Sequence, residues 1–340
     1  MEITTVIPTR NRPQHMRTVL RSLSTQNLPA NEIIVVDASD DYSYQPAMTK
    51  EFHMLPLIWL KSQPAVCIQR NIGISKAKGD WIFLCDDDIE LPVNYLEQLA
   101  DYARREATCG AVAGRLLQQE RGQWVHQYPV VHFYDLVWRF VFQLSIWGSI
   151  DTIAAPYLLR PFYSVIMRRY RTRGNSRSLA GWPLVTQWDG EAIQTKFYSL
   201  GANLIRKEWL TASPYDEVLD PSGIGDNYGV AQGFPGEKPI HVLSATFAYH
   251  HLATENRLPR PLTHYRRALA LHYFLKRNNS SFLTRLLFSW SLLGQATYYA
   301  FKNRGALASA NVRVLLLVLM GKNPYWLAYR SNVKTAQPEL

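Results

Sequence analysis

The first 115 residues repeat one pattern, in which a short apolar segment and a polar turn alternate with stretches of helical spacing. Apolar strands are expected at residues 4–8, 32–36, 57–61, 81–84 and 110–116. Helices are expected at residues 14–24, 66–78 and 92–106. Strands joined by helices of this length require right-handed crossovers, so the pattern predicts an α/β fold with a mostly parallel central sheet.

Polar and charged residues follow three of these strands. They are Thr9 to Arg12, Asp37 to Asp41, and Asp86 to Asp88. Ligands of open α/β sheets bind at the carboxyl ends of the strands. The sequence therefore predicts that these three segments converge on one ligand site.

The composition bounds the class of protein. The 340 residues are 47% hydrophobic and 19% charged, which excludes a disordered chain. The net charge of +10 favours polyanionic partners, but the basic residues are dispersed and no nucleic-acid-binding motif occurs, so we expect no nucleic acid partner. One basic run, residues 168–173, is expected to be a mobile loop or a surface patch.

The cysteines and the hydropathy pattern indicate a compartment. Cys67, Cys85 and Cys109 are odd in number and lack C-x-x-C spacing, which argues against a disulfide framework and a structural zinc site. The first residues do not form a signal peptide, and no segment is a clean transmembrane span. We therefore expect a cytoplasmic protein.

The acidic run Asp86-Asp87-Asp88 carries the strongest chemical signal. Three adjacent carboxylates repel one another, and oxygens from alternate residues can hold Mg²⁺ or Mn²⁺, which binds a diphosphate. The alternative is a solvated acidic turn that caps the helix expected near Pro92.

Asp37 and Arg70 each have a functional and a purely structural interpretation. Asp37 can accept a hydrogen bond from the imide of uracil or thymine, or serve as a turn residue at the strand end. Arg70 can reach a diphosphate, or be a surface arginine of an ordinary helix.

Four ordered motifs resemble the signatures of family 2 glycosyltransferases of the GT-A fold. They are VIPTRNRP at 6–13, IVVD at 34–37, QRNIGISKAKGD at 69–80 and FLCDDD at 83–88. The resemblance implies that Thr9, Arg12 and Asp37 line the nucleotide pocket, and that Arg70 and Asn71 lie near the diphosphate. It also implies that Asp86 and Asp88 form a DxD metal motif. Asp87 is assigned to the nucleotide sugar.

A weaker resemblance continues through residues 201–208, 215–217 and 223–227, where the family carries its acceptor strand and its catalytic base. Asp226-Asn227 stands where an acidic pair is usual. Asp226 is therefore expected to be the base, with Glu217 as the alternative. The alternative for Asp226 is a structural role as the N-cap of a helix.

Two histidines follow an apolar strand at residues 243–249. GT-A enzymes often supply a histidine as a further metal ligand after such a strand, so the resemblance makes either His250 or His251 a candidate. Arg257 could clamp the diphosphate if its segment closes over it. Each histidine could equally be an ordinary core or surface residue.

The last 80 residues return to helical spacing, with basic residues among Leu, Phe, Trp and Tyr. This pattern is typical of amphipathic helices on an anionic membrane, and equally of helices that pack on a catalytic domain or in a dimer interface. The expected segments are a nucleotide-sugar-binding half at 1–115, an acceptor and catalytic half at 116–260, and a helical region at 261–340.

The expected function is metal-dependent, inverting transfer of a sugar from a UDP- or dTDP-sugar to a hydroxyl of a glycan or lipid-linked acceptor, in surface polysaccharide synthesis. The expected location is the cytoplasm, at the inner face of the membrane. A degenerate protein that binds the sugar nucleotide without turnover is an alternative, because Asn227 cannot accept a proton. A nucleotidyltransferase is discounted, since residues 9–13 contain no glycine.

Overall fold

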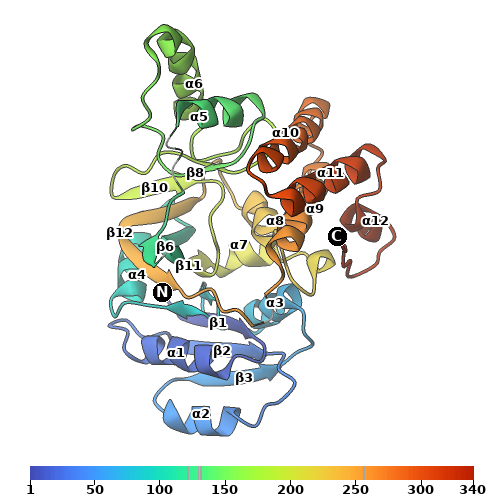
Figure 1. The fold of residues 1–340 in the computed structure, drawn as a ribbon. Coiled ribbons are helices and arrows are strands. Elements are labelled where there is room, and N and C mark those ends of the chain that lie inside the picture. The colour runs from blue at the N-terminus through green and yellow to red at the C-terminus, as the bar shows by residue number, and fades with distance from the viewer. Residues whose placement is uncertain (121, 129, 131, 256) are drawn as a thin grey trace.

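A computed structural model describes residues 1–120, 122–128, 130, 132–255 and 257–340. Its centre is a ten-stranded sheet with helices on both faces, and an arm formed by α5 and α6 extends from one end (Figure 1). The main path of the sheet runs β10 (Ala192–Thr195), β12 (Ile240–His250), β6 (Ala111–Glu120), β11 (Ala202–Arg206), β4 (Trp81–Cys85), β1 (Ile3–Thr9), β2 (Glu32–Asp37) and β3 (Leu57–Lys61). Four short strands complete the set: β5 (Ile89–Glu90) on β12, β7 (Gln123–Val125) on β6, and the separate pair β8 (Ile146–Trp147) and β9 (Leu184–Val185).

The pairing explains where a site can form. The strands β4, β1, β2 and β3 are mutually parallel, as are β6 and β12. Strand β11 lies between these two groups and runs antiparallel to both β4 and β6. The carboxyl ends of β1, β2 and β4 therefore share one edge of the sheet.

Helices cover each face because their apolar sides match the buried strand residues. On one face lie α1 (Pro13–Ser24) and α4 (Tyr95–Arg105), whose apolar residues share a core with the sheet. On the other lie α3 (Val66–Lys76), α7 (Lys207–Ala212), α8 (Asp226–Gly233) and α9 (Arg260–Arg277). The remaining helices are α2 (Gln45–Glu51), α5 (Phe133–Val141), α6 (Arg160–Arg173), α10 (Phe282–Phe301), α11 (Gly305–Leu319), α12 (Pro324–Arg330) and the short 3₁₀ turns η1 (Tyr157–Leu159) and η2 (Glu217–Leu219).

One glycine brings α3 close to the sheet. A Cβ on Gly73 would lie 2.3 Å from Cγ1 of Val6 on β1, so only glycine allows this approach. The close packing carries Arg70 and Asn71, which lie on the same helix, to the edge where β1 ends.

The expected α/β fold with a mostly parallel sheet is confirmed. The expectation of a loop or patch at residues 168–173 is wrong in one respect, because these residues form the last turns of helix α6. The pattern also failed to predict α2, which has a single buried residue, Met48, and so shows little apolar periodicity. The three-segment division stays a prediction.

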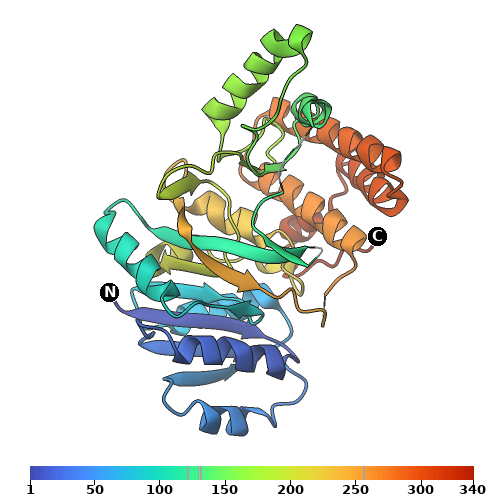
Figure 2. The same ribbon diagram turned by 60° about the vertical axis from the view of Figure 1, so that its left-hand side comes forward.

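The C-terminal helices pack unequally. Helix α9 is embedded in the core, whereas α10 and α11 form a hairpin that projects beside it (Figure 2). Among the described residues, the stretch Gly305–Arg330 has the length and hydropathy of a membrane span, with 22% of its most apolar window buried. It is divided in the structure into α11 and α12, where Asn323 caps α12 by accepting from the backbone N–H groups of Tyr325 and Trp326.

Candidate functional site

The site is built where β1, β2 and β4 end. Thr9 is the last residue of β1, and Asp86 follows β4 directly. The backbone N–H of Asp86 donates to the carbonyl of Gly201 at 2.8 Å, which ties the acidic run to the start of β11. The three carboxylates then point to three different sets of partners.

Asp87 is held by the segment after β1. The hydroxyl of Thr9 donates to Oδ2 of Asp87 at 2.7 Å, and Nη1 of Arg12 donates to Oδ1 at 2.8 Å. Burial raises the pKa of Asp87 to about 6, although Arg12 opposes that rise. These contacts join two of the predicted motifs across 75 or more residues of sequence.

Asp88 faces the segment that follows β12. Nε2 of His250 lies 3.1 Å from Oδ1 of Asp88, and Nη2 of Arg257 lies 3.5 Å from Oδ2. The backbone N–H of Ala253 also donates to Oδ2 at 2.9 Å. Burial alone would raise the pKa of Asp88, but the hydrogen bonds and the positive charge around it hold that pKa well below its usual range. Asp88 therefore stays ionised at neutral pH.

Asp86 belongs to a third arrangement, in which one arginine bridges two carboxylates. Nη2 of Arg70 lies 2.7 Å from Oδ1 of Asp86, and Nη1 forms an ion pair with Oδ2 of Asp226. The Arg70 guanidinium also lies 5.0 Å from the ring centre of Tyr215. Burial raises the pKa of Asp226 to about 6, while Arg70 lowers it. The expected base thus lies beside the expected phosphate-binding arginine.

A glycine makes room for this bridge. A Cβ on Gly201 would lie 2.2 Å from Oδ2 of Asp86. The carboxylate of Asp86 therefore occupies the space that any larger residue at position 201 would need.

The pocket expected around Asp37 is closed by its own neighbours. Asp37 is fully buried, and its Oδ1 accepts from the backbone N–H of Ser39 at 2.8 Å. Its Oδ2 accepts from the Tyr44 hydroxyl and from Nε2 of Gln45, the latter at 2.7 Å. A nucleobase that binds Asp37 would have to displace Tyr44 or Gln45. The sequence offered no signal for these two residues, because they begin a helix, α2, that the pattern did not predict.

Two other candidates have structural partners. The Asn71 side chain holds the backbone of Tyr215 through bonds of 2.9 and 3.0 Å, and it lies 3.5 Å from Oε1 of Glu217. Nε2 of His251 lies 2.7 Å from Oε2 of Glu90 on β5. The structure therefore brings His250 to Asp88 and His251 to a different carboxylate.

Asp226 is the first residue of α8, and the N-cap position belongs to Gly225, which has φ +95°. Asn227 follows, and its side-chain oxygen is buried without a hydrogen-bond partner among the described residues.

The donor atoms at Asp88 fit a hard divalent cation. Within the described residues no group of three or more His, Cys, Asp or Glu side chains is placed to hold a metal. Asp88 and His250 supply one carboxylate and one imidazole, and Gln118 lies 3.2 Å from Nδ1 of that ring, fixing its orientation. Two protein ligands suit Mg²⁺ or Mn²⁺ bound mainly through phosphate oxygens and water, and they do not suit structural zinc.

Comparison with solved structures supports the fold. The chain is similar to S. aureus TarS 1-349, with a TM-score of 0.51 at 14% identity, over 98% of this chain and 92% of that one. It is also similar to mannosyltransferase PcManGT from Pyrobaculum calidifontis, solved in complex with GDP-Man and Mn²⁺, with a TM-score of 0.50 at 13% identity, over 98% and 86% of the two chains. The fold is that of a GT-A transferase.

Sequence comparisons identify the family of the chain. The uncharacterized glycosyltransferase YwdF of Bacillus subtilis (strain 168) is 36% identical over 101 residues, 29% of this chain and 37% of YwdF. An uncharacterized glycosyltransferase of Haemophilus influenzae is 30% identical over 90 residues, 26% of this chain and 30% of that protein. The matches thus span about a third of each relative. The model of glycosyl transferase family 2 matches residues 4–173, half of the chain. The chain belongs to glycosyl transferase family 2.

Proposed function

We propose that the protein is a metal-dependent inverting enzyme that transfers a sugar from a UDP- or dTDP-sugar to a hydroxyl of a glycan or lipid-linked acceptor, in surface polysaccharide synthesis. The observation that carries the proposal is the bridge from Asp86 through Arg70 to Asp226, beside Asp88 and His250. Through this bridge, the guanidinium of Arg70, which can bind the diphosphate, also contacts Asp226, the carboxylate that can accept the proton of the acceptor hydroxyl.

The bridge suggests how the base becomes active. A diphosphate offers the Arg70 guanidinium a stronger pair of acceptors than the carboxylates do. When Arg70 turns to the diphosphate, Asp226 loses the positive charge that lowers its pKa, and its affinity for a proton rises. Asp226 then accepts the proton of the acceptor hydroxyl as that oxygen attacks the sugar from the face opposite the nucleotide.

Charge on the departing nucleotide is met by the other residues of the site. Asp88 and His250 would hold Mg²⁺ or Mn²⁺, and such an ion offsets the negative charge that develops on the diphosphate. Arg257, which lies beside Asp88, and Arg12, which lies beside Asp87, add positive charge at the same edge of the sheet. PcManGT, whose structure contains GDP-Man and Mn²⁺, supports a nucleotide-sugar donor with a divalent ion.

A membrane surface fits the exposed residues of the C-terminal hairpin and of the arm. Large apolar side chains are exposed on α10, α11 and η1: Phe282, Leu283, Leu286, Phe301, Leu316, Leu319, Tyr157 and Leu158. The exposed cations Arg160, Lys302 and Arg304 accompany them. Apolar side chains with cations at their border bind anionic lipid surfaces. We place the enzyme at the cytoplasmic face of a membrane, where a lipid-linked acceptor would be available.

The testing experiment is a donor screen with purified full-length chain. Thermal shift and slow nucleotide release are measured with Mn²⁺ or Mg²⁺ and a panel of UDP- and dTDP-sugars. We expect one donor to raise the melting temperature in the presence of the metal, and we expect Asp88→Ala to abolish that rise. If no nucleotide sugar changes the melting temperature, the donor proposal fails. A shift without nucleotide release in the presence of candidate acceptors would favour the degenerate alternative.

A further inference from the structure

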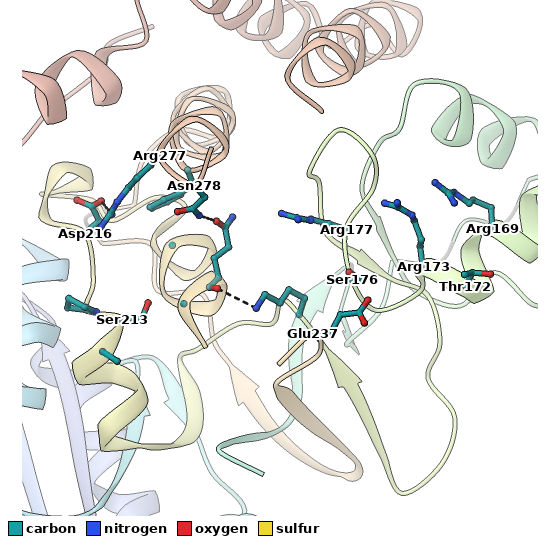
Figure 3. Close-up of a pocket in the computed structure, with 17 residues that line it drawn as sticks. Arg169, Thr172, Arg173, Ser176, Arg177, Ser213, Asp216, Glu237, Arg277 and Asn278 are labelled. Atoms are coloured by element: carbon teal, nitrogen blue, oxygen red, sulfur yellow. Dashed lines mark hydrogen bonds and ion pairs between the residues drawn. The ribbon is translucent and has the colours of Figure 1, made fainter. Parts of the chain in front are cut away.

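A second charged region is lined by residues that take no part in the donor site. A cavity of about 890 Å³ is lined from one side by the end of α6 and the loop after it, and from the other by α8 and the end of α9 (Figure 3). Its lining includes Arg277 and Asn278, at and just after the C-terminal end of α9, whereas Arg257 of the donor site precedes the start of that helix. Since α9 has 18 residues, Arg277 lies about 27 Å along the helix axis from the segment that carries Arg257. At its nearest point the lining includes Gly229, three residues after Asp226 on α8.

The lining of this cavity is strongly basic. Five cationic side chains face two carboxylates there, and the cations are Arg169, Arg173, Arg177, Lys196 and Arg277. Two of the five are neutralised or satisfied within the protein. Arg277 forms an ion pair with Asp216, and Nζ of Lys196 donates to the carbonyls of Gln232, Phe234 and Gly236.

The other three arginines lack such partners. No hydrogen bond or ion pair joins the guanidinium groups of Arg169, Arg173 or Arg177 to any residue in the described part of the chain. Arg169 and Arg173 are four residues apart on α6 and so share one face of the helix. Figure 3 shows Arg177 extending from the α6 side toward Asn278 across the cavity.

The three arginines repel one another. Burial lowers the pKa of Arg173, and the charges of Arg169 and Arg177 lower it further, while Glu237 opposes this. Like charges gathered on a concave surface destabilise a protein unless an anion is bound among them. Guanidinium groups match phosphate oxygens in geometry and charge, so phosphate is the anion that this cluster best accommodates.

The rest of the lining indicates what carries the phosphate. The lining also holds hydroxyl and amide side chains, namely Thr172, Ser176, Ser213, Gln232 and Asn278. Asn278 donates to Gln232, and the hydroxyls of Thr172 and Ser213 donate to backbone carbonyls, which leaves acceptor lone pairs on the hydroxyls. Such groups hydrogen-bond to the hydroxyls of sugars and polyols. The volume is also far larger than a single ion needs.

We propose that this cavity binds a phosphorylated carbohydrate with at least two phosphate groups, held by Arg169, Arg173 and Arg177, at a site separate from the donor site. The proposal goes beyond the proposed function, and it does not depend on it, because binding is measured with no nucleotide sugar present. The ligand belongs either to a phosphate-bearing acceptor chain or to a free sugar phosphate.

The test uses the full-length protein and glucose 1,6-bisphosphate as probe, with calorimetry at 0.15 M salt and a chelator present. We expect saturable binding that Arg173→Ala with Arg177→Ala weakens at least tenfold. The matched control is Arg168→Ala with Arg171→Ala, which removes the same amount of charge from α6 outside this cavity, and we expect less than a twofold change. Thermal melting of both variants confirms that they are folded.

Two outcomes would overturn the proposal. Equal weakening by the two pairs would mean that general surface charge attracts the probe. Binding of inorganic diphosphate as tightly as of the bisphosphate sugar would remove the assignment to a carbohydrate. A further titration with phosphorylated dextran separates the two sources of the ligand. Binding tighter than that of glucose 1,6-bisphosphate, at equal phosphate concentration, assigns the cavity to a polymeric acceptor. Weaker binding assigns it to a free sugar phosphate.

Discussion

The arginines of the donor site and those of the basic cavity are used in opposite ways. In the donor site, Arg12 is paired with Asp87, and Arg70 with Asp86 and Asp226. In the cavity, Arg173 and Arg177 line the same space without a carboxylate within ion-pair distance among the described residues. An arginine that carboxylates hold in place can change partner from a carboxylate to a diphosphate with little reorganisation. An unpaired cluster of arginines gains stability only when an anion binds.

The same contrast applies to apolar side chains. Around the donor site the strands are buried on both faces, so each side chain that reaches the site is fixed by its strand or helix. On α10 and α11 large apolar residues remain exposed. The first region holds its side chains in fixed positions, and the second leaves large apolar side chains exposed, where we propose that a membrane covers them.

Substitution of the proposed base is the sharpest test of the donor site, in which the arginines are paired with carboxylates. Asp226→Asn should reduce turnover by about 1,000-fold, since general-base catalysis contributes about 10²- to 10⁴-fold. Steady-state kinetics with the donor found in the screen measures this. Glu217→Gln is the matched control and should change turnover less than tenfold. If the two results are exchanged, Glu217 is the base.

The two neighbouring histidines offer a second test. His250→Ala should weaken metal-dependent donor binding by at least about tenfold, because it removes the imidazole beside Asp88. His251→Ala removes a partner of Glu90 and should change that binding less than threefold. Titration of donor affinity against Mn²⁺ measures both variants, and equal effects would contradict the assignment of His250.

The pH profile tests the carboxylates of the paired site. The pKa of Asp226 and that of Asp87 are raised to about 6, so both groups are ionised above that pH and take up protons below it. Activity should therefore be nearly constant above about pH 7 and fall about tenfold between pH 7 and pH 5 for one essential carboxylate. A steeper fall would indicate that both are required. Activity that rises as the pH is lowered through 6 would exclude Asp226 as the base.

A glycine tests how tightly the bridge is packed. Gly201→Ala places a methyl group where the Asp86 carboxylate lies, and should lower the free energy of unfolding by about 1–3 kcal/mol. Urea denaturation measures it. Gly305→Ala is the control, because nothing within 4 Å opposes a Cβ there, and it should be neutral. Unchanged stability in Gly201→Ala would show that Asp86 can leave Arg70 freely.

The smallest expected effect belongs to the exposed hairpin. Phe301→Ser and Leu319→Ser, at side chains that are 79% and 68% exposed, should each weaken binding to anionic vesicles by about fivefold. Met54→Ser is the control, because Met54 is 82% exposed beside α2 and β3, away from the hairpin. Vesicle flotation measures all three. Deleting residues 262–340 would be a poor test, since α9 is part of the core. Equal binding by all variants would exclude the hairpin as the membrane surface.

The sequence by itself determined the α/β fold and the first half of the site. Strands and helices of the first 115 residues follow from local apolar spacing, and residues directly after parallel strands must share one edge of the sheet. The convergence of Thr9, Arg12 and the acidic run at that edge therefore followed from the sequence, while their roles stay predictions. The histidine beside Asp88 was not predictable, because His250 ends β12 and His251 follows it directly, and only the tertiary structure decides which imidazole lies beside Asp88.

Only the tertiary structure decided the contacts between distant segments. Arg70 and Asp226 are 156 residues apart, and the packing of α3 and α8 on the same face of the sheet is what joins them. Tyr44 and Gln45 cover Asp37 from a helix with almost no apolar periodicity, and the basic cavity combines α6 with the end of α9. Such contacts depend on how finished elements pack, and local spacing along the chain carries no information about that packing.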